Sequence, residues 1–457
     1  MSLRSVARST LVLVCLAAAS ALWPMPARAA EITRVASSFD KDNPFDLDLW
    51  VGFERTQRRA KIVRERHQEG HIADVLELRY ASIHQSLPMR LAIGLFHDLE
   101  LHVGASVVFN YDQAWWYPAE KNDDGTPVVS DANSTIHNNC LDPRGNVLSP
   151  DCVDSPGNGS KPIFESNGES HRSGFSDVSF GLSWAPLSDK RDDTKPKWVL
   201  TFDYTLPTGL LDPGSVMKPW TAATITQKGP IGDGAHRFSF STAISKRLGA
   251  IDPYLKFMYT YGLATTNSIS NCQMSDAKKA ENLGYAENCN TGPWTTSETG
   301  LKPPHVGGFL FGAEFFPYDN PEKSQSVSID IQLGALYISE GRGYNELSDA
   351  LGKLLYNEEY LSLGGSIGVY GRAAKYVQLR VNASFYTDTP HFLTTEPVGK
   401  DRDGACRGDS SSRCVDLDNH SGEISPTFDF RYDMPGRRFR ITEVTVFQIM
   451  ATGVVNF

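Results

Sequence analysis

Hydrophobic and polar residues alternate along most of this chain. The segment SVSIDIQLGALYIS (326–339) places Val327, Ile329 and Ile331 on one face and Ser328 and Asp330 on the other. A period of two predicts β-strands. The same pattern recurs in DLELHVGASVVFNY (98–111) and KWVLTFDYTLPTG (197–209). Segments of about ten residues with one apolar face are typical of transmembrane barrels, whereas β-sandwich strands follow one another at shorter spacing.

The pattern predicts twelve strands whose connections alternate between short and long. Short turns such as HD (97–98), GA (249–250) and AK (374–375) share one end, and long polar segments share the other. This alternation is typical of an outer-membrane barrel with periplasmic turns and extracellular loops. An even count puts both termini in the periplasm. The expected fold is therefore an all-β, transmembrane antiparallel barrel with strands at 46–66, 75–97, 99–113, 173–186, 197–209, 235–248, 251–264, 304–317, 325–340, 359–373, 376–388 and 441–457.

The first hairpin differs from the other strand pairs in length. Its two strands are about twice as long as a membrane crossing requires. We expect both strands to continue beyond the bilayer, with the basic residues of the first at the outer rim. If the strands instead fold back, the barrel has fourteen strands.

The two ends of the chain carry export features. Arg4 and Arg8 precede the apolar run LVLVCLAAASAL (11–22), and Ala27 and Ala29 form a small-x-small cleavage pattern. We expect 1–30 to be a signal peptide, 31–44 a short periplasmic tail, and 45–457 the barrel. The formal net charge is −10. It becomes −13 without Arg4, Arg8 and Arg28 of the leader, which argues against a nucleic-acid partner.

The last strand ends in a terminal phenylalanine, as closing strands of outer-membrane barrels commonly do. Its apolar face is the expected barrel-closing signal. Aromatic residues near predicted strand ends, as in WWY (115–117), fit the girdles that favour Trp and Tyr at membrane interfaces. The closing signal comprises Phe447, Ile449, Val455 and Phe457.

Six cysteines remain after the leader, and all lie in predicted long loops. Their proximity in sequence favours the disulfides Cys140–Cys152, Cys272–Cys289 and Cys406–Cys414, which an oxidising compartment permits. The last pair encloses an Arg-Gly-Asp triplet, which we interpret as turn-forming residues of a solvent-exposed loop. The flanking carboxylates form a candidate calcium site, made of Asp401, Asp403, Asp416 and Asp418; no other cofactor is expected.

Charged residues of both signs fall on the face that the alternation turns inward. A selective pore often has one dominant sign of charge. The mixture therefore leaves two interpretations open, a lumen filled by paired charges and a polar pathway for a small solute. His102 has no assignable serine partner, so we expect no catalytic residues and no enzyme. The lumen-lining candidates are Asp46, Asp48, Glu54, Arg90, Glu100, His102, Asp203, Arg237, Lys256, Glu314, Asp330, Arg372 and Arg380.

Three motifs together resemble a known family. They are GLFHDLELHVG (94–104), FSDVSFGLSWAPL (175–187) and LTFDYTLPTG (200–209). The chain resembles outer-membrane barrels of the phenol-degradation MetA-pathway family, distant relatives of FadL-type channels for fatty acids and aromatic hydrocarbons. The resemblance covers residues 89–263 and the closing strand. It departs at the N-terminus, where FadL-type channels carry a plug and this chain has only the short tail.

The resemblance and the polar inward face imply a channel for a small hydrophobic or aromatic molecule in the Gram-negative outer membrane. Outer-membrane lipid and the solute are then its partners. The alternative is a closed structural or adhesive barrel that binds envelope proteins in a larger assembly.

Overall fold

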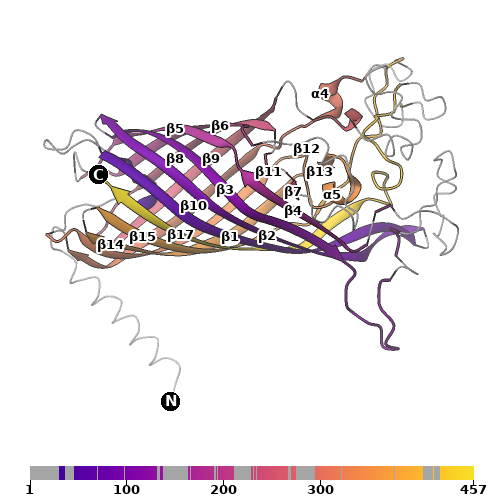
Figure 1. Ribbon diagram of the computed structural model, residues 1–457, viewed down its shortest axis with the longest axis horizontal. Coiled ribbons are helices and arrows are strands. Elements are labelled where there is room, and N and C mark those ends of the chain that lie inside the picture. Colours follow the sequence, from indigo (N-terminus) through magenta and orange to yellow (C-terminus); the bar gives the residue numbers. More distant parts are fainter. Residues whose placement is uncertain are drawn as a thin grey trace.

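The computed structural model is a β-barrel whose strands are steeply inclined to its long axis (Figure 1). Among the described residues, no helix is long and apolar enough to cross a membrane. The structure describes residues 30–36, 46–68, 70–96, 98–130, 134–136, 163–164, 166–189, 192, 194–209, 228–229, 231–232, 234–265, 269–273, 294–320, 322–374, 376–404, 415 and 422–457.

Twelve antiparallel strands form a closed ring, as predicted. The ring closes because β3 pairs with β2 on one side and with β5 on the other. Strand β4 (Gly168–Phe175) pairs with the second half of β3, and β5 pairs with its first half. The ring strands are β1 (Asp46–Gln68), β2 (His71–Phe96), β3 (Leu99–Trp116), β5 (Val178–Leu187), β6 (Lys197–Leu206), β8 (Ala235–Ser245), β9 (Ile251–Ala264), β10 (Val306–Asn320), β11 (Gln325–Ile338), β14 (Tyr360–Ala374), β15 (Val377–Asp388) and β17 (Phe439–Asn456).

Short elements occupy the remaining described segments. They lie before the first strand or in the long connections. They are η1 (Glu31–Thr33), β7 (Lys228–Gly229), η2 (Asn271–Gln273), α4 (Thr296–Thr299), β12 (Gly341–Gly343), α5 (Ser348–Leu351), β13 (Leu355–Asn357) and β16 (His391–Phe392).

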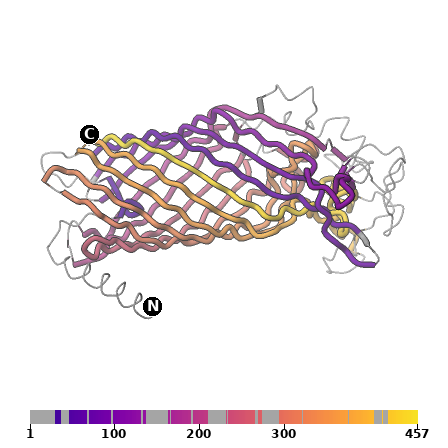
Figure 2. The backbone as a smooth tube through the Cα atoms, turned by 90° about the horizontal axis from the view of Figure 1, so that it is seen from below, coloured from indigo at the N-terminus to yellow at the C-terminus, as the bar shows by residue number. Residues whose placement is uncertain are grey.

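The barrel has two unlike ends. The short connections, such as those between β2 and β3 and between β14 and β15, lie at the end that also carries the C-terminus, which we call the turn end (Figures 1 and 2). The long connections lie at the opposite loop end. The first hairpin has the longest strands of the ring, which stay paired from Asp46↔Gly94 to Gln68↔His71. These strands do not fold back, so the barrel has twelve strands and not fourteen. Their extension beyond the bilayer stays a prediction.

The outer face of the ring is an apolar belt. Side chains such as Phe53 (45 % exposed), Phe257 (52 %) and Leu333 (52 %) point away from the interior on strands all around the barrel. Soluble proteins rarely expose apolar patches of more than a few hundred Å². A closed barrel leaves no unpaired strand edge in lipid. The belt therefore fits the hydrocarbon layer of a membrane.

The loop end has its own hydrophobic core. Buried residues of the first hairpin, including Ile62 and Leu78, pack there with loop residues such as Leu347, Leu351 and Phe439. We call residues 341–357 the inserted loop. It contains β12, α5 and β13, and Figure 1 shows it within the loop end of the barrel.

Ion pairs hold the inserted loop to the strands. Arg58 of β1 lies 2.9 Å from Glu346, and Arg172 of β4 lies 2.7 Å from Asp349. Contacts to strands on separate parts of the ring place the inserted loop across the loop end.

The expected aromatic girdle is only partly correct. Trp116 is 39 % exposed and faces outward, but the neighbouring Trp115 is 1 % exposed and belongs to the loop-end core. Consecutive strand residues point to opposite faces, so the two tryptophans cannot both lie in a girdle. Trp184 and Trp198 are exposed near the turn end, as a girdle requires.

Candidate functional site in the barrel interior

The described part of the N-terminal tail, residues 30–36, lies inside the barrel near the turn end (Figure 2). It binds the strands through its backbone. Three of its N–H groups donate to strand carboxylates: Ala30 to Asp252 Oδ2 (2.5 Å) and Glu31 to Glu314 Oε2 (2.8 Å) on the neighbouring strands β9 and β10, and Ala36 to Glu100 Oε2 (2.6 Å) on β3. Strand carboxylates thus anchor the tail to the inner wall of the barrel.

Ion pairs reinforce the tail. Arg34 donates to Asp48 Oδ2 at 3.1 Å and to the Gln378 side chain at 2.6 Å. Glu31 pairs with Arg380 of β15. Each charged side chain of this part of the tail therefore contacts a polar partner on the barrel wall.

A charged network lies beside the tail on β2, β3 and β6. His102 contacts Glu100 through Nδ1 (3.1 Å) and Asp203 through Nε2 (2.6 Å). Arg90 donates to Glu100 at 2.6 Å. Both ring nitrogens of His102 are thus engaged by carboxylates. This arrangement cross-links strands and leaves neither nitrogen free to activate a nucleophile in this conformation.

A cavity of about 460 Å³ lies directly against the tail. One part of its lining is apolar and the other is charged. Because its residues come from β1, β2, β9, β10, β11, β14, β15 and β17 as well as from the tail, the cavity is inside the barrel. It is lined by Glu31, Ile32, Trp50, Pro88, Met89, Arg90, Lys256, Glu314, Asp330, Gln332, Tyr370, Arg380, Asn382, Met450 and Thr452.

Trp50 is the central aromatic residue of this cavity. The guanidinium carbon of Arg380 lies 4.0 Å from its ring centre, and that of Arg90 lies 5.3 Å away. Cation–π contacts of this kind hold the indole in place. Lys256 also lines the cavity and forms no ion pair with the described residues. The cavity therefore combines a fixed aromatic surface with an available cation.

The structure brings most of the lumen candidates together around the tail and the cavity. Arg90, Lys256, Glu314, Asp330 and Arg380 line the cavity, while Asp48, Glu100, His102 and Asp203 belong to the tail and its network. The other four candidates line neither the cavity nor the His102 network. Glu54 contacts Thr56 and His84, and Arg237 lies toward the loop end of β8. Asp46 and Arg372 lie toward the turn end, near Arg34 and Glu31 of the tail.

Several interior residues are absent from the sequence-based list. Trp50, Asp252, Tyr254 and Tyr370 face inward, and the two tyrosine hydroxyls donate to Asp330 at 2.7 and 3.2 Å. The alternation could have identified them, since Asp252 and Tyr254 share a face with Lys256. The tail could not be found in this way because it has no period.

The loop-end predictions lie largely outside the described residues. Cys272, in η2, is disulfide-bonded, but Cys140, Cys152, Cys289, Cys406 and Cys414 are not described. Asp416 and Asp418 are likewise not described. Asp401 and Asp403 lie within 4.8 Å of Glu423, which accepts hydrogen bonds from two backbone N–H groups of the same turn. The calcium site stays a prediction.

The expected closing signal lies on the membrane face of β17. Phe447, Ile449, Val455 and Phe457 are all exposed on the outside of the barrel, and their role as an assembly signal stays a prediction.

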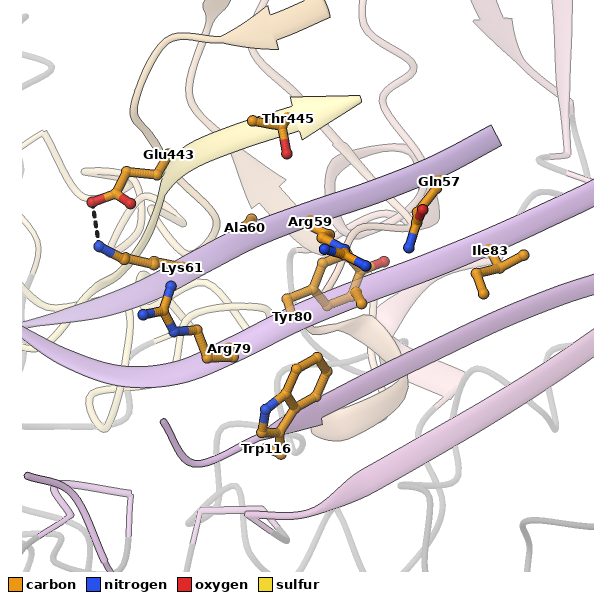
Figure 3. Close-up of a pocket in the computed structure, with 11 residues that line it drawn as sticks. Gln57, Arg59, Ala60, Lys61, Arg79, Tyr80, Ile83, Trp116, Glu443 and Thr445 are labelled. Atoms are coloured by element: carbon orange, nitrogen blue, oxygen red, sulfur yellow. Dashed lines mark hydrogen bonds and ion pairs between the residues drawn. The ribbon is translucent and has the colours of Figure 1, made fainter. Parts of the chain in front are cut away.

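A second hollow, of about 380 Å³, lies on the outside of the barrel (Figure 3). Arg59, Lys61 and Arg79 line it with Trp116, and Lys61 donates to Glu443 at 2.5 Å. Outward residues of β1 are apolar up to Phe53 and polar from Arg55 onward. The hollow therefore marks the border of the apolar belt toward the loop end. It lies on the face of β1 opposite to Trp50.

Comparison with known proteins gives structural likenesses only. No family model and no curated protein matches the chain. Similar solved structures include an outer membrane channel from Pseudomonas putida F1, which is 10% identical over 89% of this chain and 95% of that chain, with a TM-score of 0.37. A FadL homologue from Pseudomonas aeruginosa is 7% identical over 90% of each chain, with a TM-score of 0.34.

Another such structure is the outer membrane protease OmpT from Escherichia coli. It is 8% identical over 90% of this chain and 96% of that chain, with a TM-score of 0.26. One of these structures is thus a homologue of FadL, the type of channel that the sequence resembles. At these identities and scores the likenesses carry no argument about cargo, and the barrel fold rests on the strand pairing itself.

Proposed function

We propose that this protein is a channel of the Gram-negative outer membrane for a small hydrophobic or aromatic molecule. Its long loops are then extracellular and its termini periplasmic. The observation that carries the proposal is the interior cavity beside the tail. Its volume of about 460 Å³ lies within the range of roughly 300–1,000 Å³ common for small-molecule sites.

The lining of the cavity supports an aromatic solute with one polar substituent. Ile32, Pro88 and Met450 supply an apolar wall around the Trp50 ring. Thioethers and aromatic rings attract one another, so this wall favours flat apolar molecules. Charged and hydroxyl-bearing groups on the opposite side can orient a polar substituent.

A closed structural barrel is the second candidate, and a specific observation favours it. The inserted loop lies across the loop end and the tail lies inside the turn end. A solute that crosses the barrel must therefore pass both of these positions, whereas a structural barrel need not open at either. Deletion of the tail distinguishes the two functions.

The test is uptake of radiolabelled toluene by intact Gram-negative cells, together with planar-bilayer conductance of the purified protein. We expect expression of the wild-type chain to raise uptake and deletion of residues 31–36 to raise conductance. Trp50→Arg should lower uptake because it fills the cavity with charge. The matched control is Phe202→Leu, which changes an outward residue that is 48 % exposed.

The proposal fails if neither the wild-type nor the tail-deleted protein gives uptake or conductance, even after its disulfides are reduced. That result, with folded protein present in the outer membrane, would favour the closed structural barrel.

A further inference from the structure

Asp252 is a buried carboxylate that forms no ion pair with the described residues. It is the second residue of β9 and is fully buried. Its Oδ2 accepts the Ala30 N–H at 2.5 Å, and its Oδ1 is buried with no hydrogen bond from the described residues. The nearby Arg247 pairs with Asp319 at 3.0 Å. A buried carboxylate without a cation is unfavourable.

The atom that contacts Asp252 is the backbone nitrogen of Ala30. Ala30 itself is fully buried. As a peptide amide, this nitrogen supplies one N–H and no charge. As the first nitrogen of a processed chain, it would be an α-ammonium group with a positive charge and three donors. An ammonium here would neutralise Asp252 and reach its second oxygen.

The sequence places the cleavage site at the same bond. Ala27 and Ala29 form the small-x-small pattern, and a signal peptidase cuts after the second small residue. Cleavage there leaves Ala30 as residue one, which is one position earlier than a leader that ends at residue 30. The export pattern and the buried contact are independent observations, and both single out the backbone nitrogen of Ala30.

We propose that the mature chain begins at Ala30 and that its α-ammonium group forms a buried ion pair with Asp252. This pair latches the tail inside the barrel. Thr33 supports the same position, since its hydroxyl contacts the Ser245 hydroxyl at 2.9 Å. Removal of the signal peptide is then required both for release of the chain and for full docking of the tail. The latch does not depend on what the barrel transports.

The test uses the purified full-length mature protein in detergent. Edman sequencing or intact mass should identify Ala30 as the first residue. Insertion of one glycine between Ala29 and Ala30 moves the ammonium by about 3.5 Å and leaves every barrel residue unchanged. We expect hydrogen exchange at the tail amides to become at least about tenfold faster in this variant. Asp252→Asn should have the same effect.

The matched control is Asp192→Asn, in an exposed turn at the same end of the barrel. It should leave tail exchange unchanged. Heat-modifiable migration on gels reports whether each variant has a folded barrel, and the glycine insertion keeps the test valid if Asp252→Asn does not fold. A first residue other than Ala30 would overturn the latch. So would unchanged tail exchange in the glycine variant. Neither measurement involves solute flux, so the latch and the channel function fail independently.

Discussion

Arg64 is the residue whose loss should most weaken the closure of the loop end. It lies on β1 beyond the apolar belt and is 2 % exposed. Its guanidinium donates to the backbone carbonyls of Arg437 (2.9 Å), Thr135 (2.5 Å) and Arg431 (2.5 Å). One side chain thus joins the first hairpin to two different long loops.

Arg64→Met keeps the length of the side chain and removes all donors. Hydrogen bonds from charged groups contribute about 1.5–3 kcal/mol each, and loss of a buried charged partner costs about 3–5 kcal/mol. We take about 3 kcal/mol as the smallest decrease that this substitution causes in the free energy of opening the loops. Since about 1.4 kcal/mol corresponds to a factor of ten, the open population should rise at least about 100-fold.

Limited proteolysis with subtilisin measures this population, because cleavage follows the open state when opening and closing are fast. The loops of the Arg64→Met protein should be cut at least about 100-fold faster, while the barrel stays heat-modifiable. Arg59→Met, an exposed position on the same strand, is the control. Equal cleavage rates for the two variants would refute the argument that Arg64 holds the loops together.

Two further predictions concern a loop and a strand. Burial raises the pKa of Asp433 to about 7 from its usual 3.8. The stability that its protonation contributes to the loops is therefore full below pH 3.8 and is lost as the pH rises through about 7. Subtilisin cleavage of the loops should accelerate from pH 5 to pH 8, and this acceleration should be smaller in Asp433→Asn. A side chain at Gly181 would overlap His102 and Asp203, so Gly181→Ala should destabilise the barrel by about 1–3 kcal/mol in thermal unfolding. Gly371→Ala, where the added carbon meets nothing, should be neutral, and equal melting temperatures would contradict the steric argument.

The strands could be predicted because the membrane imposes a simple rule on them. Every second residue must face lipid, so the alternation of Val327, Ile329 and Ile331 with polar neighbours indicates both the strand and its outward face. The same rule identified Glu100, Glu314 and Arg380 as inward candidates. The observed register agrees, since Glu314 lies opposite both Asp252 and Asp330 on the neighbouring strands.

The tail and the inserted loop could not be predicted because they obey no period. The Ala30 contact with Asp252 joins residues 222 positions apart, and it forms through a backbone atom that every residue possesses. Arg64 likewise binds carbonyls, whose positions depend on the path of the loops. Trp115 shows that local composition alone can mislead. Its place in WWY indicated an interfacial girdle, but the alternation along the strand turns its side chain inward, where it is buried.

Different kinds of interaction hold the tail at the turn end and the inserted loop at the loop end. At the loop end, large side chains such as Ile62, Leu78 and Leu351 are fully buried, and each contributes about 1.5–3 kcal/mol. The tail buries only small apolar residues, Val35 being the largest.

Most of the binding of the tail comes from hydrogen bonds and ion pairs beside a cavity. Hydrogen bonds to charged groups contribute about 1.5–3 kcal/mol each, and water that enters the cavity competes for the same groups. The packed apolar side chains of the loop-end core are not subject to this competition. If the protein is a channel, as proposed above, we therefore expect its solute to leave at the turn end.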